Sequence, residues 1–367
     1  MKTGGPGVPV SADPRGAPRR WWRDCLIGLA ITVALGLGLE VAARVYWYRQ
    51  AVSLHDDFAV VHPSGRWTLA PRYHENGTDV NSLGFRGPET TVVKPGETFR
   101  IVALGDSVTF GHRLHFTYPA LLQARLEHRP ECRARIEVIN AGVPGYQTRH
   151  IRGRLDEDVR PLRPDLLLVL AGWNDLYSDN PASPAKRLDP QSPFNRVLRV
   201  SYAAKALTKL AFDLRPPSGE ASPTVRQVYE SFAAPVFVSD YEGLLAIADD
   251  MRTPVVMLTL PSLLGSPDWR EAASRIVFPY YTTNVDLLML LWTKYNRAVR
   301  DLAARDRRPL IDLAREISQI PGSQRLFGDT NHLNPTGTTV MAGILENDLL
   351  ATGLLPCGAQ HARLHAR

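Results

Sequence analysis

The sequence predicts an α/β protein in which helices cover both faces of a parallel five-stranded sheet, with one transmembrane helix before it. Two observations predict this class. From residue 99 onward, short apolar runs alternate with segments of helical spacing, which is typical of a parallel sheet with crossover helices. Nearer the N-terminus, the 19 residues from Cys25 to Ala43 include one charged side chain, that of Glu40.

The N-terminal apolar run predicts a membrane anchor over residues 21–48. As a helix it would extend for roughly 28 Å, close to the thickness of a bilayer core. The alternative is a cleaved signal peptide with "VAA" at 41–43 as its cleavage site. We favour the anchor because Glu40 is unfavourable beside such a site and because aromatic residues lie at both ends of the run. These are Trp21 and Trp22, then Tyr46, Trp47 and Tyr48.

The charge distribution argues against a nucleic-acid partner and orients the anchor. Residues 1–50 carry +4 of the formal net charge of +6, which leaves about +2 for the remainder, too little for a phosphate-binding face. Basic residues dominate before the apolar run: Lys2, Arg15, Arg19, Arg20 and Arg23. The positive-inside rule therefore predicts that residues 1–20, a disordered tail, are cytoplasmic and that residues 49–367 lie outside a bacterial inner membrane.

The elements follow in order after the anchor. Residues 49–98 form a predicted stem with "VNSLGFRGPE" at 80–89, where Gly84 and Gly87 indicate turns. The main domain covers 99–356, and 357–367 form a tail. The predicted strands of the main domain are 99–105, 136–142, 164–172, 254–260 and 309–314. Its predicted helices are 117–129, 150–162, 285–306 and 335–352.

A proline-rich insert over residues 178–240 interrupts the alternation of strands and helices. Within it, residues 194–214 have the spacing of an amphipathic helix with apolar and basic sides. We favour a helix packed on the domain. A lid bordering the site, or a helix on the membrane surface, is the alternative.

Polar segments stand where four of the predicted elements meet one edge of the sheet. In open α/β sheets, ligands bind at the carboxyl ends of the strands. Asp106 and Ser107 follow the first strand, "NAGVPGY" (140–146) the second, and "GWND" (172–175) the third, while "GDTNHLN" (328–334) precedes the last helix. The sequence therefore predicts that these four segments form one site.

The residue types in this set are those that serine catalysis requires. A serine hydroxyl is a weak nucleophile until a base such as His332 takes its proton, and that imidazole needs an orienting acceptor such as Asp329. An oxyanion needs converging donors, for which a backbone N–H of Ser107, a glycine N–H and an asparagine amide are candidates. Each residue alone has a structural alternative; a Gly-Asp-Ser triplet such as that of Ser107, for example, more often has a structural role such as capping a helix.

The four segments together resemble the motifs of the SGNH hydrolases, also called GDSL-type esterases. "GDSVTFG" (105–111), "NAGVPG" (140–145), "GWND" and "DTNH" (329–332) are similar to the family's first, second, third and fifth blocks. The resemblance implies Ser107, His332 and Asp329 as triad, Ser107, Gly145 and Asn174 as oxyanion donors, and no metal or cofactor. It also implies a flavodoxin-like three-layer sandwich with strand order 2-1-3-4-5, hydrolysing acyl esters. The pair His112 and His115 in "HRLH" is a weak metal candidate without further ligands.

The predicted function is hydrolysis of acyl esters, such as O-acetyl or other short-chain esters, outside the cytoplasm. The expected location favours O-acylated cell-surface glycans as substrates. Two alternatives stay open: an O-acyltransferase that uses the same triad on a polysaccharide, and a non-catalytic glycan-binding module.

The three cysteines give a separate structural expectation. Cys25 begins the apolar run and is expected to be a small buried side chain. In the fold that the resemblance implies, the helices that end near Cys132 and Cys357 lie on the same face and run to the same edge. A Cys132–Cys357 disulfide worth roughly 2–4 kcal/mol is then plausible, with two free thiols as the equal alternative.

Overall fold

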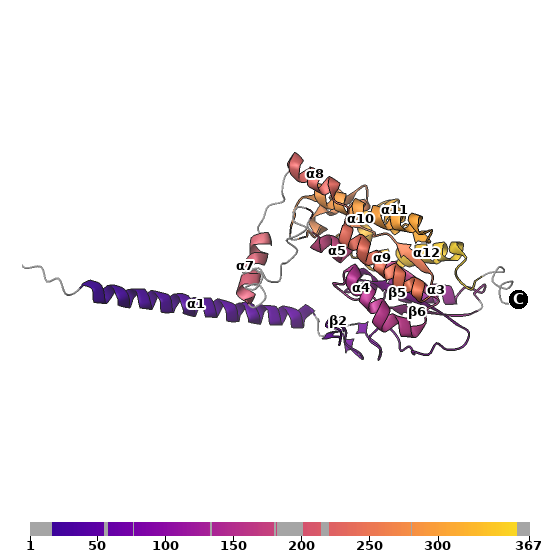
Figure 1. Cartoon of the computed structure of the whole chain (residues 1–367), viewed down its shortest axis with the longest axis horizontal. Helices are drawn as coiled ribbons and strands as arrows, with labels where there is room; N and C mark the ends of the chain where they lie inside the picture. The colour runs from indigo at the N-terminus through magenta and orange to yellow at the C-terminus, as the bar shows by residue number, and fades with distance from the viewer. Residues whose placement is uncertain are drawn as a thin grey trace, which may run out of the picture. The chain divides into compact units, whose positions relative to one another are not determined.

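The structure is a computed structural model that describes residues 17–54, 58–75, 77–132, 134–179, 181, 201–213, 220–279 and 281–357. It contains two compact units (Figure 1). One comprises Met1–Leu54 with Pro190–Leu214, and the other comprises His55–Asp189 with Arg215–Arg367. Most of the predicted tails and residues 194–200 of the predicted insert helix lie outside the described residues.

The first unit contains the helices α1 (Ala17–Leu54) and α7 (Tyr202–Asp213), which pack against each other. Within the described residues, Trp21–Val45 of α1 is the one segment long and apolar enough to cross a membrane, with 25 residues and a mean hydropathy of 2.2 in its most apolar window. Cys25 is exposed on α1 rather than buried within the protein, because no other described element covers that end of the helix.

The second unit is built on a five-stranded parallel sheet. Its strands are β5 (Thr98–Gly105), β6 (Arg135–Asn140), β7 (Leu166–Leu170), β8 (Val255–Leu258) and β9 (Leu310–Ile311). They are hydrogen-bonded in the order β6-β5-β7-β8-β9. The predicted α/β class and the order 2-1-3-4-5 are therefore confirmed. Because this sheet is covered on both sides, nearly every residue of its central strands is buried and apolar.

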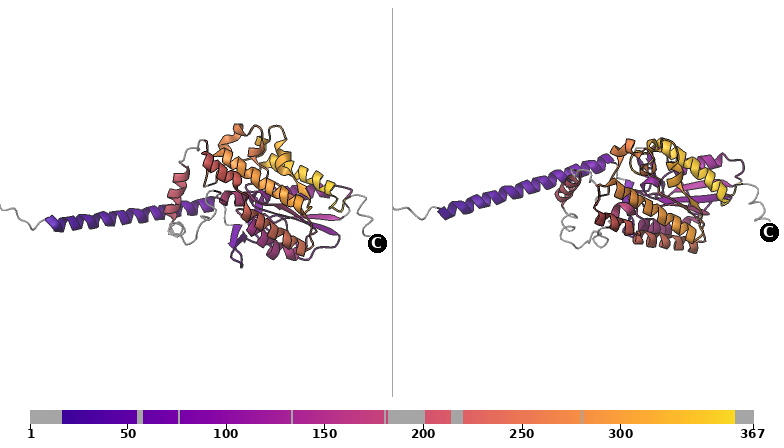
Figure 2. Two further views of the ribbon diagram at one scale, coloured as in Figure 1. Left: turned by 45° about the horizontal axis from the view of Figure 1, so that its top comes forward. Right: turned by 90° about the horizontal axis from the view of Figure 1, so that it is seen from above.

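Helices form a layer on each face of the sheet (Figure 2). On one face α3 (Tyr118–Glu127) packs against α12 (Pro335–Thr352). On the other, α4 (Thr148–Arg154) packs against α9 (Pro235–Asp250), and the rings of Phe237 on α9 and Tyr295 on α10 (Val285–Arg305) lie 4.8 Å apart. Shorter helices connect these elements: α2 (Ser107–Phe110), α5 (Trp173–Ser178), α8 (Pro223–Ser231), α11 (Leu313–Ser318), η5 (Leu263–Gly265), η6 (Trp269–Arg275) and η7 (Ser323–Leu326).

Two predicted elements differ in the structure. The predicted helix 150–162 changes after α4 into a π-helical turn, η2 (Leu155–Val159), and a 3-10 turn, η3 (Arg160–Leu162). Pro161 has no N–H to continue the α-helical ladder there. The predicted strand 309–314 is reduced to β9, because the Asp312 side chain accepts a hydrogen bond from the Arg315 backbone and starts α11.

Of the predicted stem, residues 49–54 belong to α1, and the part from residue 58 onward forms two short hairpins and a loop. The hairpins pair β1 (Ala59–Val61) with β2 (Trp67–Leu69) and β3 (His74–Glu75) with β4 (Thr78–Asp79). In the following loop, Arg86 donates from its backbone to the Asn140 carbonyl (3.1 Å), and its guanidinium donates to the carbonyls of Phe110 and Gly111 (2.6 Å each). Arg86 therefore joins the stem to the end of α2, the helix that begins with Ser107.

The expected disulfide is present: Cys132 and Cys357 are bonded across a sequence separation of 225 residues. Cys132 follows α3 and Cys357 follows α12, the two helices that pack on one face. The shared face places their far ends side by side, as the strand order requires.

Reduction of this disulfide should lower the free energy of unfolding by about 2–4 kcal/mol, because the bond closes a very long loop in the unfolded chain. The measurement is denaturant unfolding of the detergent-solubilised chain with and without reductant. The Cys132→Ser/Cys357→Ser variant is the control and should match the reduced wild type in both conditions. Equal midpoints for oxidised and reduced wild type would contradict the prediction.

Candidate active site

Ser107 lies in the turn that joins β5 to α2. The carboxylate of Asp106 accepts a hydrogen bond from the Val108 backbone (2.9 Å) and is the N-cap of α2. Ser107 is therefore the first residue of the helix and not its cap, which leaves the Ser107 hydroxyl available for another partner.

That partner is His332. Its Nε2 lies 2.8 Å from the Ser107 Oγ, and its Nδ1 lies 2.8 Å from Oδ2 and 3.0 Å from Oδ1 of Asp329. Ser107, His332 and Asp329 thus form one continuous series of hydrogen bonds, although Ser107 and His332 are 225 positions apart in the sequence.

The loop that carries Asp329 and His332 is held by its own backbone and by Thr330. Asp329 Oδ1 accepts from the backbone N–H groups of Asn331 (3.1 Å) and His332 (2.9 Å). The buried Thr330 accepts from the Val277 backbone through its hydroxyl (2.6 Å) and from the Ser262 hydroxyl through its carbonyl (2.8 Å). These bonds fix the distance between the carboxylate and the imidazole before any substrate binds.

Asn174, the candidate oxyanion amide, lies beside the same turn. Its Nδ2 donates to the Asp106 carboxylate (3.3 Å) and to the Tyr146 carbonyl (3.1 Å). Gly145, which precedes Tyr146, is exposed and has a φ of +80°, a conformation that disfavours any side chain. Asn174 therefore connects the residue before Ser107 with the residue after Gly145.

The second block is held against α2. Asn140 donates to the Thr109 carbonyl (2.8 Å) and accepts from the Gly142 backbone (3.0 Å). A Cβ on Gly142 would lie 2.3 Å from the Phe110 nitrogen, closer than packed atoms can approach, so only glycine permits this contact. The block thus brings its loop close to the start of α2.

The charges around this series depend on burial. Burial would raise the pKa of the Asp329 carboxyl, but its hydrogen bonds with His332 outweigh that effect and hold the pKa below the usual value. Asp329 therefore accepts as a carboxylate at neutral pH. His112, whose ring centroid lies 5.6 Å from that of His332, has a pKa lowered to about 4 by burial and by His332, so it is uncharged at neutral pH.

Asp106 is fully buried, and burial raises its pKa to about 6 against the opposing hydrogen bond from Val108. Since the pKa is higher in the folded state than the ordinary 3.8, the protonated form of Asp106 favours folding. Its contribution to the free energy of unfolding is complete below pH 4 and is lost as the pH rises through 6. Relative to wild type, the free energy of unfolding of Asp106→Asn should rise by about 2–3 kcal/mol from pH 4 to pH 7.5, because asparagine caps α2 without ionising. Denaturant unfolding at both pH values measures this, and a difference that is independent of pH would contradict it.

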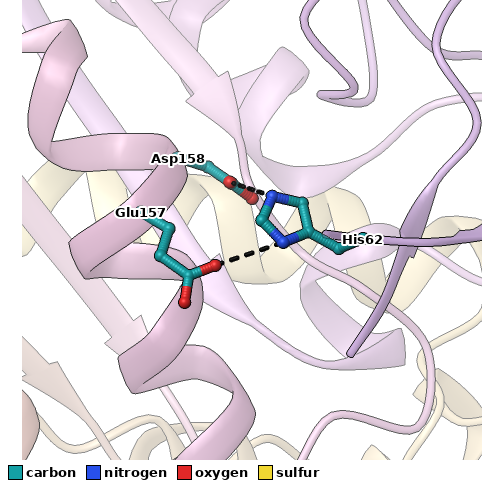
Figure 3. Close-up of side chains that lie close together, drawn as sticks. All are labelled: His62, Glu157 and Asp158. Atoms are coloured by element: carbon teal, nitrogen blue, oxygen red, sulfur yellow. Dashed lines mark ion pairs between the residues drawn. The ribbon is translucent and has the colours of Figure 1, made fainter. Parts of the chain in front are cut away.

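A second cluster of polar side chains lies between the stem and η2 (Figure 3). The two ring nitrogens of His62 approach the carboxylates of Glu157 (3.2 Å) and Asp158 (3.3 Å). These three side chains could hold a metal ion by proximity. Arg66 already forms ion pairs with both carboxylates, at 3.2 and 2.7 Å, so a protein cation occupies this position and the cluster fits a structural ion-pair network.

The structure separates the two histidines of "HRLH" and adds residues that sequence reasoning missed. His112 lies beside His332, whereas His115 lies against Gly77. Arg86, which holds the end of α2, belongs to "NSLGFRGPE", and that motif was its one sequence signal. Asp106, as partner of Asn174, and Trp67, beside Gly145, had no separate signal.

One protein family matches most of the chain. The profile of the GDSL-like Lipase/Acylhydrolase family matches residues 103–340. No curated protein matches the sequence. Among solved structures, a lipase/acylhydrolase from Enterococcus faecalis is 18% identical, with 71% of this chain and 99% of that chain covered at a TM-score of 0.42. An acetylxylan esterase from Geobacillus stearothermophilus is 15% identical, with coverages of 69% and 92% and a TM-score of 0.42.

Proposed function

The chain belongs to the GDSL-like Lipase/Acylhydrolase family, and on that premise we propose that it is a serine esterase acting through Ser107, His332 and Asp329. The observation that carries the proposal is the series of hydrogen bonds Ser107 Oγ to His332 Nε2 (2.8 Å) and His332 Nδ1 to Asp329 (2.8 Å). It is the arrangement that activates a serine hydroxyl and stabilises the imidazolium formed when the proton moves.

In the first half of the reaction, Ser107 Oγ attacks the ester carbonyl while its proton passes to His332 Nε2. The N–H groups of Ser107 and Gly145 and the Asn174 amide stabilise the negative oxygen of the tetrahedral intermediate. The carbon–oxygen bond to the alcohol then breaks, and His332 returns the proton to the departing alkoxide. Water attacks the acyl-enzyme with His332 again as base, which releases the acid and restores Ser107.

The esterase activity can be tested on the full chain in detergent with 4-nitrophenyl acetate. We expect an initial burst of nitrophenol release as the acyl-enzyme accumulates, followed by slower steady release. Both should be absent from Ser107→Ala. A chain that transfers the acetyl group to an added oligosaccharide with little hydrolysis would instead be an acyltransferase. A chain that performs neither reaction but binds the oligosaccharide would be a glycan-binding module.

We further propose that α1 is a retained anchor and that the hydrolase unit lies outside the cytoplasm. Within the first unit, Glu40 accepts hydrogen bonds from the Ser201 hydroxyl (2.8 Å) and from the backbones of Tyr202 and Ala203 (3.0 Å each). Cleavage after "VAA" would remove the acceptor for the start of α7, which supports an anchor over a leader.

The anchor and its orientation can be tested in cells. The measured mass of the mature chain should show that its N-terminal residues are retained. Protease added to intact spheroplasts should digest residues 49–367. A shortened chain would contradict retention, and a protected domain would contradict the orientation. This location favours O-acylated cell-surface glycans as the natural substrates.

A further inference from the structure

Trp67 is an aromatic side chain beside the candidate oxyanion loop that the proposed reaction does not use. It begins β2 and is 37% exposed. A Cβ built on Gly145 would lie 3.5 Å from Cζ2 of the Trp67 indole, so the indole covers the side-chain side of this glycine. Both residues are exposed, so a partly exposed aromatic side chain lies directly beside the loop that carries a proposed oxyanion donor.

The indole is held rigidly in this position. The indole Nε1 donates to the Pro144 carbonyl (3.1 Å), and the backbone carbonyl of Trp67 accepts from the Tyr146 hydroxyl. The ring lies edge-on to Tyr146, with centroids 5.4 Å apart, and is tilted over His150 at 4.7 Å.

The ion-pair network of the stem supports the same residue. Arg66, which precedes Trp67, donates to the Tyr146 hydroxyl (3.0 Å) and is bound by Glu157 and Asp158. His62, between the two strands of the same hairpin, approaches the same two carboxylates (Figure 3), so this network fixes the hairpin at the position from which Trp67 reaches the loop. A side chain held by so many contacts loses little conformational entropy when a ligand binds it.

We propose that the exposed indole of Trp67 stacks against a pyranose ring of the acylated substrate and forms a sugar subsite next to the oxyanion loop. A flat aromatic surface suits the apolar C–H face of a sugar ring, and nearby polar groups suit its hydroxyls. The accessible neighbours of Trp67 fit this chemistry, because they are the half-buried His150 and, bonded to His150 at 3.3 Å, the exposed Arg149. An acyl chain would need a trough of aliphatic side chains, which these residues do not provide.

The inference rests on the proposed esterase activity, since it names the alcohol part of the substrate. The test compares two esters on the full chain in detergent: 4-nitrophenyl acetate, which has no sugar, and partially O-acetylated tetramers of glucose or N-acetylglucosamine. We expect Trp67→Ala to raise KM for the tetramers at least 10-fold and to change kcat/KM for the aryl ester less than threefold. Trp67→Phe should recover most of the loss. Trp269 is a half-buried tryptophan on η6, and Trp269→Ala should leave the kinetics of both esters unchanged.

Other results would overturn the subsite. Equal losses on both esters would mean that Trp67 only supports the Gly145 loop, and unchanged kinetics on both would mean no role. A selective loss on 4-nitrophenyl octanoate would assign Trp67 to the acyl group. If wild type hydrolyses none of these esters, the proposed function fails, and calorimetric titration of the tetramers into wild type and Trp67→Ala still tests the subsite. Weaker binding to the variant supports it, and equal or absent binding to both contradicts it.

Discussion

Ser107→Ala should remove nearly all ester hydrolysis, a loss of about 10³-fold or more in kcat, because no other hydroxyl lies within hydrogen-bond reach of His332 among the described contacts. His332→Ala should cause a loss of the same order, since the hydroxyl then keeps its proton. The double variant should be no slower than either single variant, because the two residues act as one unit. The measurement is kcat and KM for 4-nitrophenyl acetate.

Matched substitutions far from the site control for effects on folding. Ser231 at the end of α8 and His128 at the end of α3 are exposed, so Ser231→Ala and His128→Ala should keep wild-type rates. The free energies of unfolding of all four variants should lie within about 1 kcal/mol of the wild-type value. Turnover by folded Ser107→Ala at the wild-type rate would end the serine-nucleophile proposal.

Asn174→Ala should lower kcat by about 10²–10³-fold with little change in KM. An amide aimed at the developing oxyanion is worth about 3–4 kcal/mol in the transition state and little in the ground state. Because Asn174 also donates to Asp106 (3.3 Å) and to the Tyr146 carbonyl (3.1 Å), its replacement frees two acceptors as well as removing one donor.

Asn174→Asp separates these effects, because it keeps the size of the side chain but has no amide donor and places a second carboxylate beside Asp106. We expect it to be at least as slow as Asn174→Ala. A loss below threefold for Asn174→Ala, in a chain whose Ser107→Ala variant is inactive, would remove Asn174 from the oxyanion hole. An equal loss expressed in KM alone would make it a ground-state binding residue.

The sequence alone determined the class of the fold and the four segments of the candidate site. Alternation of apolar runs and helical segments predicted the parallel sheet, and the carboxyl ends of parallel strands meet at one edge whatever lies between them. For this reason Ser107, Asn174 and His332 could be grouped from their places after strands and before the last helix. In the fold that the family resemblance implies, the opposite edge made a Cys132–Cys357 disulfide plausible but left two free thiols equally open, and the structure shows the bond.

Local patterns were less informative where a single backbone group decided the outcome. The helical spacing of 150–162 carried no signal for the π-helical turn of η2, and Asp312 ended β9 by capping α11. The helix α9 begins at Pro235, inside the segment expected as an insert. Its start was missed because a proline at a helix start resembles a loop proline in the sequence.

Only the tertiary structure decided which groups bond to Ser107 and which support its turn. Asp106 caps α2 and holds Asn174, so Ser107 is free to bond with His332. Trp67 reaches the Gly145 loop from a hairpin 78 residues earlier in the chain, counted from Gly145 back to Trp67, and Glu40 on the apolar helix meets the start of α7. Such contacts depend on the packing of distant segments, which leaves no periodic pattern in the sequence. The strands could be predicted because their burial leaves such a pattern, a short apolar run.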